Sequence, residues 1–363
     1  MSAALQVQQP RRRRRRVFVG VDTHQLTHHA AVVDQAGRVL ADQQFEVSTD
    51  GYQALTGWAA EYGQVITVGV EQTGSYGAAL ARHLTATGIT VIEVNTFDIG
   101  ARILRGKTDQ LDAVAAARAV ASGRAKTVVK DTTGEVEALR CLKIAHDTAV
   151  RARTVAINQM RDLWTTAPAP IRETLGGKPG TAAFRQHCLA LPLTGTGPDH
   201  AVAVALRCLT GRINALNTEI KDLTAAMTPI VEHLAPHLLA LRQVGIQIAA
   251  QIIVTAGQNL HRLHSEAAFA RLCGIAPIPA SSGKTSRHRL HRGGDRQANR
   301  ALYLIAVGRL KNHPETRAYR DRRQAEGRTT NDIIRCLKRY IAREVFRELT
   351  LDLNPPKTTP TKG

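Results

Sequence analysis

Hydrophobic and polar positions in the first third of the chain follow the patterns of short strands separated by helices. Residues 17–47 contain three strand-like segments, VFVGVD and then two apolar runs joined by a turn at Asp34-Gln35-Ala36-Gly37. A helix of about a dozen residues is expected from Thr49, a suitable N-cap, followed by the strand-like QVITVGVEQTG. YGAALARHLTATG predicts a helix that ends at Gly88, and ITVIEVN predicts another strand.

The resulting order is β-β-β-α-β-α-β, followed by an Ala-rich helix at DQLDAVAAARAV. This order indicates an α/β unit with a mixed sheet, and it fits a ribonuclease H-like arrangement. In that arrangement the first and fourth strands are neighbours at the centre of the sheet. Asp22 ends the first strand and Glu71 ends the fourth, so both acids should reach the same edge.

The middle of the chain turns helical. One long amphipathic helix with a basic side is expected at about 131–165, and prolines and glycines at 168–180 interrupt it. Its apolar face would carry Val136, Leu139, Leu142, Ala145, Ala149, Ala152, Val155 and Met160. Its polar face would carry Arg140, Lys143, Arg151, Arg153 and Arg161. A second long helix at about 199–227 has near-heptad spacing, so the two helices could form an antiparallel coiled-coil arm or an ordinary hairpin packed on the body.

A third, mainly helical region is expected after Pro229. LLALRQVGIQIAAQIIVTAG resembles a helix–hairpin–helix unit whose turn at Gly245 could offer backbone N–H groups to a phosphate. Between Pro277 and Asn299 the chain is dense in Ser, Gly, Lys, Arg and His and has little helical pattern. A loop this basic is expected to lie against phosphate. Helices should follow at about 296–311 and over NDIIRCLKRYIAREVFREL.

The net charge of the chain indicates the class of its binding partner. The chain has 363 residues, 43% of them hydrophobic, which suits a globular protein of two or three domains. Its 49 Lys and Arg against 30 Asp and Glu give a formal net charge of +19, an excess that favours a polyanion, above all nucleic acid. The arginine run at 11–16 suits a disordered, phosphate-seeking arm or a solvated extension without a role.

Cysteine use and hydropathy indicate the compartment. The five cysteines are scattered and odd in number, which suggests neither a disulfide framework nor a zinc knuckle. A reducing, cytoplasmic and nucleoid-associated setting is therefore expected. No apolar run is long enough to span a bilayer, and no signal-peptide-like segment follows the N-terminal arginines.

Two pairs of side chains are candidates for chemistry. Asp109 and Asp112 are three apart at the start of a helix, so they share one face and would repel each other unless a cation lay between them. Taken alone they could be an N-cap and a solvated acid, but Asp22 and Glu71 can converge on them. Four carboxylates suit two Mg²⁺ ions and phosphodiester chemistry. The second pair, Ser281-Ser282, precedes Gly283-Lys284, and its spacing alone favours a phosphate-contacting turn.

Several segments resemble one known family in the same order from about residue 17 to 350. They are VGVDTH, GVEQTGSYG, RGKTDQLDAVAAAR, QVGIQIAAQII, ARLCGIAPIPASSGK, HRGGDRQANRALY and AYRDRRQAEGRTTNDIIRCLKRYIAREV. Together they resemble bacterial insertion-sequence transposases of the IS110 type. The resemblance implies a ribonuclease H-like (RuvC-like) DEDD domain, a helical coiled-coil arm and a mainly helical C-terminal domain with a nucleophilic serine. The implied activity is cutting and rejoining DNA, with an RNA made from the element guiding the choice of sites.

The resemblance also implies roles for particular residues and partners. The DEDD set that would bind Mg²⁺ maps to Asp22, Glu71, Asp109 and Asp112, and the family serine maps to Ser282. Independently of the resemblance, the positive charge, the basic loop and the Gly245 turn predict that nucleic acid is bound by Lys107, Gly245, Lys284, Arg287, Arg289 and Arg292. The partners would be donor and target duplex DNA, a guide RNA and further copies of the chain, because exchanging strands between two duplexes needs more than one active site.

Departures and alternatives accompany this interpretation. The family's acidic residue after the helix–hairpin–helix appears here as Gln258-Asn259, and the serine doublet leaves two candidate nucleophiles. A metal-dependent, structure-selective endonuclease of junction-resolvase type would need only the first domain, and a basic nucleic-acid-binding protein would need no chemistry. The expected division is a basic arm, a RuvC-like domain, a helical arm, a serine transposase domain and a tail, at 1–16, 17–130, 131–229, 230–350 and 351–363.

Overall fold

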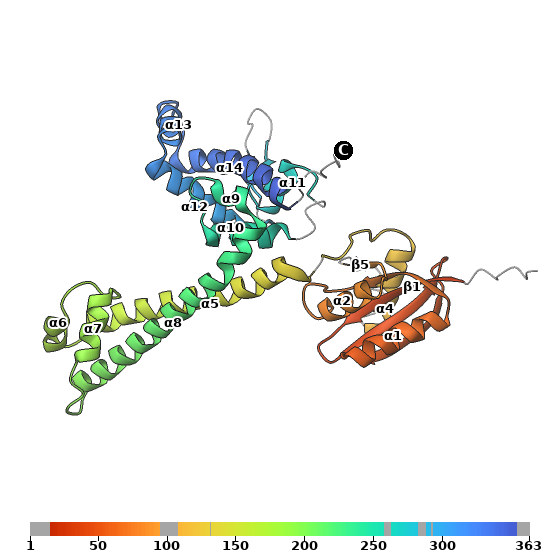
Figure 1. Cartoon of the computed structure of the whole chain (residues 1–363), viewed down its shortest axis with the longest axis horizontal. Helices are drawn as coiled ribbons and strands as arrows, with labels where there is room; N and C mark the ends of the chain where they lie inside the picture. The colour runs from red at the N-terminus through yellow and green to blue at the C-terminus, as the bar shows by residue number, and fades with distance from the viewer. Residues whose placement is uncertain are drawn as a thin grey trace, which may run out of the picture. The chain divides into compact units, whose positions relative to one another are not determined.

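The computed structural model divides into two compact units, Met1–Thr132 and Thr133–Gly363 (Figure 1). It describes residues 15–94, 108–130, 132–257, 263–281, 288–291 and 293–353.

The first unit is built on a five-stranded sheet in the order β3-β2-β1-β4-β5. Strands β1, β2 and β3 pair antiparallel, whereas β4 runs parallel to β1 and β5 runs parallel to β4. The strands are β1 Arg16–Thr23, β2 Thr27–Asp34, β3 Val39–Glu46, β4 Gln64–Val70 and β5 Val91–Glu93. This mixed sheet confirms the predicted ribonuclease H-like order, with β1 and β4 as central neighbours.

Helices cover both faces of this sheet. The helices are α1 Thr49–Glu61, α2 Ala78–Ala86 and α4 Asp109–Ala121. Odd-numbered residues of β1, such as Val19 and Val21, share a buried core with Leu55 of α1 and Leu80 of α2. The opposite face packs against α4, and the partly buried Phe18 belongs to that cluster. Alternation along β1 therefore sends the side chain of Asp22 to the α4 face.

The second unit is mainly helical. Its arm is formed by α5 Gly134–Thr166, α6 Ala169–Leu175, α7 Ala182–Ala190 and α8 Pro198–Leu234. Its remaining elements are α9 Pro236–Ala240, α10 Ile246–Ala256, α11 Glu266–Leu272, β6 Pro277–Pro279, β7 His288–Leu290, α12 Arg296–Asn312, α13 Pro314–Ala325 and α14 Thr330–Leu353. The combination of an α/β sheet with a mainly helical region confirms the expected fold class.

Helices α5 and α8 lie side by side (Figure 1). Beyond the end of α5, the short helices α6 and α7 close a separate apolar core through Ile171 and Phe184, against Leu206 and Ile213 of α8. Sequence patterning missed both short helices because prolines and glycines surround them. Whether α5 and α8 supercoil, and whether they form a domain of their own, remain predictions.

Three boundaries differ from the expected ones. The N-cap of α1 is Ser48, whose side chain accepts a hydrogen bond from the Gly51 N–H, and Thr49 is the first helical residue. Pro229 lies inside α8, which continues to Leu234. A two-stranded hairpin, β6 with β7, occupies part of the stretch that was expected to be a basic loop.

Candidate metal centre

Two central strands deliver the first two acids. Asp22 is the penultimate residue of β1, and Glu71 directly follows β4. The parallel register pairs Gly20 with Gly69 and Val21 with Val70, so Asp22 and Glu71 are next in line on the same face. The Glu71 N–H donates to the Val21 carbonyl at 3.2 Å. Each acid is only 4% exposed, so both lie where an ionised carboxylate needs compensation.

Helix α4 delivers the other two acids in its first turn. The Thr108 side chain caps the helix by accepting a hydrogen bond from the Leu111 N–H at 3.3 Å. Asp109 and Asp112 then lie one turn apart, the first exposed and the second buried. Both acids also gain from the positive end of the helix dipole.

A glycine allows α4 to approach the sheet closely. A Cβ atom added to Gly20 would lie 2.1 Å from the Ala117 backbone nitrogen and 2.2 Å from the Ala113 carbonyl oxygen. Only a residue without a side chain fits this crossing, and Gly20 is two residues before Asp22. The close approach thus sets the height of the α4 acids above the strand end.

Asp22, His24 and Asp109 form a compact group. The His24 Nε2 atom lies 3.1 Å from Asp22 Oδ2 and 3.3 Å from Asp109 Oδ1. Burial raises the pKa of Asp22, His24 lowers it, and the charges of Asp109 and Asp112 raise it further. Because the charge of Asp112 acts on Asp22, these two carboxylates lie near each other. The structure thus brings Asp22, Asp109 and Asp112 together, and it places Glu71 beside Asp22 through the strand register.

This donor set fits a divalent cation. One ligand atom from each of Asp22, His24 and Asp109 lies within 4.8 Å of the others, close enough for one ion to contact all three. Carboxylate oxygens are the ligands of Mg²⁺ and Mn²⁺, and an imidazole nitrogen is acceptable to Mn²⁺. A cation would also offset the burial, and the smaller repulsion from Asp109 and Asp112, that raise the pKa of Asp22. The arrangement of these side chains is therefore better explained by a bound metal ion than by a group of acids without a cation.

Sequence reasoning missed His24. The signal was present in Asp22-Thr23-His24, because residues two apart on a strand project to the same face. Thr23 is buried instead, and its hydroxyl donates to the Glu71 carbonyl at 3.1 Å, which ties the two strand ends together.

Most of the predicted C-terminal site lies outside the described residues. The residues of that site outside the described ranges are Ser282, Lys284, Arg287 and Arg292. Lys107 of the first unit and the Gln258-Asn259 pair also lie outside the described residues. Ser281 is described and exposed, two residues after the end of β6. Arg289 is exposed in the middle of β7, and Gly245 is the exposed N-cap of α10. These positions are compatible with contact to a phosphate.

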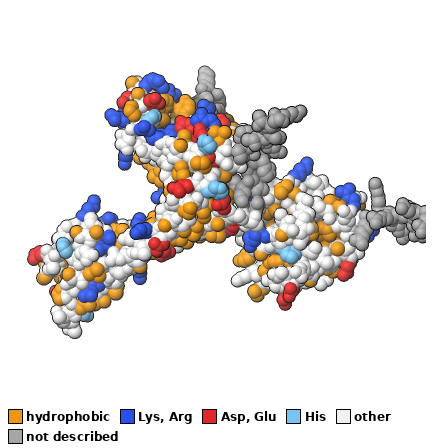
Figure 2. Space-filling model, viewed as in Figure 1, with side chains coloured by type: hydrophobic (Ala, Val, Ile, Leu, Met, Phe, Trp, Pro, Cys, Tyr) orange, Lys and Arg blue, Asp and Glu red, His pale blue; other side chains and the backbone are white. Residues whose placement is uncertain are grey.

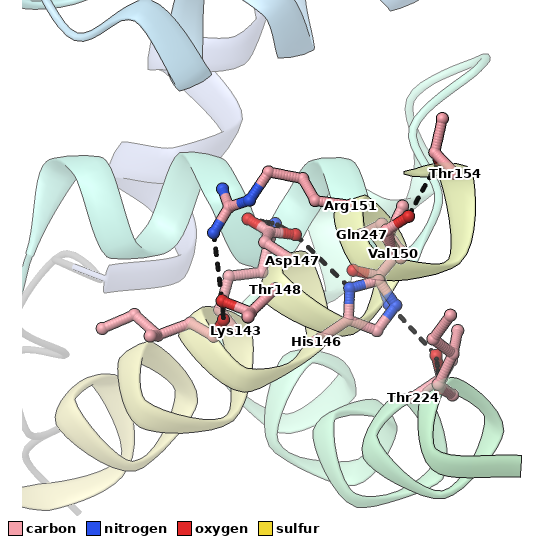
Figure 3. A network of polar contacts seen from close by, with 11 residues as sticks. Lys143, His146, Asp147, Thr148, Val150, Arg151, Thr154, Thr224 and Gln247 are labelled. Carbon is pink, nitrogen blue, oxygen red and sulfur yellow. Dashed lines mark hydrogen bonds and ion pairs between the residues drawn. The ribbon is translucent and has the colours of Figure 1, made fainter. Parts of the chain in front are cut away.

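The predicted basic face of α5 needs correction at its centre. Lys143 is 8% exposed, and its ammonium group lies 2.6 Å from both carboxylate oxygens of Asp147. His146 Nδ1 lies 3.3 Å from the same carboxylate (Figure 3). Lys143 is therefore a buried group paired with an acid, because α10 packs against α5 and helps to cover this side of it. Val155, expected in the apolar face, is 55% exposed, and Ala156 is buried in its place.

Among the described helices, none combines the length and apolar character that a membrane crossing requires.

Comparison with known proteins agrees with both units. Residues 19–167 match the DEDD transposase model of the IS110 group, and residues 235–321 match the model described as Transposase IS116/IS110/IS902 family. The chain is 26% identical over 381 aligned residues to the insertion element IS110 43.6 kDa protein of Streptomyces coelicolor, covering 90% of this chain and 92% of that protein. It is 31% identical over 164 residues to the insertion element IS900 42 kDa protein of Mycobacterium paratuberculosis, covering 44% of this chain and 39% of that protein.

The first model spans the sheet and the acidic residues, and the second spans the region that contains the serine doublet. A DEDD domain of nuclease type implies a divalent metal. On these matches and on the sheet order, the chain belongs to the IS110 family of transposases, enzymes that act on DNA.

Proposed function

We propose that this transposase is a Mg²⁺-dependent recombinase that cuts and rejoins DNA through a serine nucleophile, guided by an RNA from its own element. The observation that carries the metal part is the meeting of Asp22, His24 and Asp109 at the edge of a ribonuclease H-like sheet. Asp112 and Glu71 would complete the acidic set. When bound, the metal would supply charge neutralisation at the scissile phosphate.

The chain's own residues have distinct tasks in this proposal. Asp22 and Glu71 would hold their carboxylates at fixed strand ends, and Asp109 and Asp112 would add theirs from the first turn of α4. His24, which contacts two of the acids, would orient them or serve as a ligand itself. Such fixed placement lowers the reorganisation needed when charge develops on the phosphate.

Ser282 would carry the covalent step. Its hydroxyl would lose its proton as its oxygen bonds to phosphorus, while the bond to the departing DNA oxygen breaks and that oxygen takes up a proton. Attack by the end of a second strand would reverse these changes and release the serine, so the number of phosphodiester bonds is conserved. A serine hydroxyl is a poor nucleophile until a base or metal activates it, and Lys or Arg nearby would stabilise the phosphorane charge.

The metal proposal is tested with single substitutions. Asp22→Ala, Glu71→Ala, Asp109→Ala and Asp112→Ala should each abolish Mg²⁺-dependent DNA cleavage while the far-UV spectrum stays unchanged. Leu26→Ala, at an exposed side chain outside the acidic group, serves as the control and should retain activity. Full activity of both Asp109→Ala and Asp112→Ala would show that the site is assigned wrongly.

The serine proposal is tested by trapping the intermediate. Ser282→Ala should lose a denaturant-stable, protease-sensitive protein–DNA adduct and lose recombination, whereas Ser281→Ala should keep both. An adduct on Ser281 would move the assignment by one residue. Strand cleavage that survives in Ser282→Ala without any adduct would favour the junction-resolvase alternative.

The guide RNA and the oligomer need separate experiments. Protein purified from its host locus should carry an RNA derived from the element's non-coding end, identified by sequencing. Recombination at full rate and specificity by RNA-free protein would refute the guide. Light scattering of the active complex should give a mass of two or more chains.

A further inference from the structure

A basic hollow lies in the second unit between the β6–β7 hairpin and helices α13 and α14. Its volume is about 850 Å³. Pro277 of β6 and His288 of β7 line it, together with Arg328 in the loop after α13 and Arg335 of α14. Figure 2 shows Lys and Arg side chains gathered over the α13–α14 end of this unit, with acidic side chains among them.

The lining carries an excess of positive charge. It contains five arginines and a single carboxylate, that of Asp332; the arginines are Arg289, Arg323, Arg328, Arg335 and Arg339. Three of them have an acidic partner: Arg323 pairs with Glu326, Arg335 with Asp332 at 2.9 Å, and Arg339 with Glu266.

The other two arginines are available to a ligand. Arg289 and Arg328 are exposed, and no carboxylate of the described residues lies within 4.0 Å of either. A guanidinium without a partner is well suited to a phosphate, because its fork donates two parallel hydrogen bonds to phosphate oxygens. The hollow thus presents two guanidinium groups that form no ion pair within 4.0 Å among the described residues, one on β7 and one in the loop after α13, with Asp332 acting on Arg328 only at longer range.

The remaining lining suits the apolar part of a nucleotide. Ile275, Pro277 and Ile333 contribute hydrocarbon surface beside the arginines. Pockets that enclose small organic ligands measure roughly 300–1,000 Å³, and this volume falls in that range. A duplex presents its phosphates on a convex surface, whereas an unpaired nucleotide can enter a recess of this size.

The hairpin register identifies which strand would enter. Pro279 of β6 pairs with His288 of β7, and His288 lines the hollow. In the sequence, Ser282 of the proposed covalent step and its neighbour Ser281 come between these two paired residues. A DNA strand held there for cleavage would have its neighbouring nucleotides beside the β6–β7 rim.

We infer that this hollow binds an unpaired nucleotide of the DNA strand being cut, with its phosphate held by Arg289 and Arg328. The inference rests on the proposed serine chemistry for the identity of the strand, although the binding itself needs neither metal nor serine. Asp332 keeps Arg335 neutralised and limits the attraction for phosphate.

The test is direct binding of the full-length protein to labelled oligonucleotides in the absence of divalent metal. Arg289→Ala and Arg328→Ala should each weaken binding of single-stranded DNA by roughly tenfold, because each loses a charge-assisted contact. Duplex DNA should lose much less. Arg317→Ala on α13 removes the same charge at an exposed residue outside the hollow and should leave the single-strand affinity nearly unchanged.

A substitution that should strengthen binding distinguishes a specific effect on the hollow from damage to the fold. Asp332→Asn removes the only carboxylate of the described lining and frees Arg335, so it should tighten single-stranded DNA binding several-fold. A damaged protein would not gain affinity. Failure of Asp332→Asn to gain, together with an unchanged Arg328→Ala, would overturn the inference.

Three further outcomes would also overturn it. Equal losses on duplex and single strand would indicate a general phosphate surface, and an equal loss in Arg317→Ala would indicate mere net charge. A loss confined to single-stranded RNA would assign the hollow to the guide. None of these binding measurements depends on formation of the serine adduct. If the adduct were absent, the covalent step would be refuted, and the binding result would be unaffected.

Discussion

His28 is a buried imidazole in β2. It is fully buried and stacks on Tyr52 at a centroid distance of 5.8 Å, and only the Thr27 backbone partly offsets the effect of its burial. Burial lowers the pKa of His28 from 6.5, since the charged form would lose its hydration. The neutral ring is therefore part of the core, and protonation opposes folding.

The sign of the pH dependence follows from this lowered pKa. The unfolded chain binds a proton near pH 6.5 and the folded chain only at lower pH, so the stability contributed by neutral His28 is complete above about pH 6.5 and falls as the pH drops. Thermal unfolding at pH 7 and pH 5 should show this loss. His28→Phe, which keeps the stacking and cannot titrate, should lose less between the two pH values. An equal loss in both proteins would show that His28 is not the titrating group.

At the scale of elements, the crossing of α4 over β1 determines the metal centre. Gly20→Ala would push a methyl group into the α4 backbone, since its Cβ would meet Ala117 N at 2.1 Å. We expect a loss of roughly 3 kcal/mol of unfolding free energy, at the upper end for overpacking, and weaker Mn²⁺ binding because α4 carries two of the acids.

A glycine on α1 provides the matched control. Gly57 has no heavy atom within 4 Å of an added Cβ, so Gly57→Ala should be neutral or stabilising by about 0.5–1 kcal/mol, because alanine favours the helix. Denaturant unfolding of the two variants separates the crossing from general helix propensity. Wild-type stability and metal binding in Gly20→Ala would contradict the role assigned to the close approach.

The ion pair inside α5 makes a second prediction at this scale. Asp147→Ala would leave the ammonium of Lys143 buried without its carboxylate, which should cost about 3–5 kcal/mol of unfolding free energy. The double variant Lys143→Met, Asp147→Leu removes both charges and should recover most of that loss. Equal destabilisation in the single and double variants would mean that packing, rather than the orphaned charge, dominates.

At the scale of the whole molecule, the net charge of +19 predicts salt-sensitive binding. Each phosphate contact releases counterions, so the logarithm of affinity should fall linearly with the logarithm of salt concentration, with a slope of about −0.9 per contact on duplex DNA. Replacing Arg287, Arg289 and Arg292 together should weaken DNA binding for all sequences alike and flatten that slope, with the loss on duplex DNA coming mainly from Arg287 and Arg292. A flat response in the wild-type protein would rule out phosphate-dominated binding.

Local patterning predicted the first unit closely. The strands at 16–23, 64–70 and 91–93 and the helices between them lie where apolar alternation and the glycine signals place them. In the second unit, local patterning predicted the long helices and missed α6 and α7. Those two helices are short and lie between prolines and glycines, so they bury too few residues to produce a periodic signal. The predicted apolar face of α5 was right at Leu139, which is buried, and wrong at Val155, which is exposed.

Spacing and alternation were enough to place the strands and helices of the first unit and the acids at two strand ends, because these are local properties of the chain. The sheet order and the family followed from the arrangement that these elements fit and from the matching motifs. Tertiary structure alone decided which side chains meet. It brought His24, which follows β1, to Asp109 of α4, buried the side of α5 that carries Lys143, and gathered Arg289 and Arg328 around one hollow. Those pairings depend on how closely α4 crosses Gly20 and on how a hairpin faces a helix end. Such distances arise from packing between segments far apart in the chain, and no local pattern encodes them.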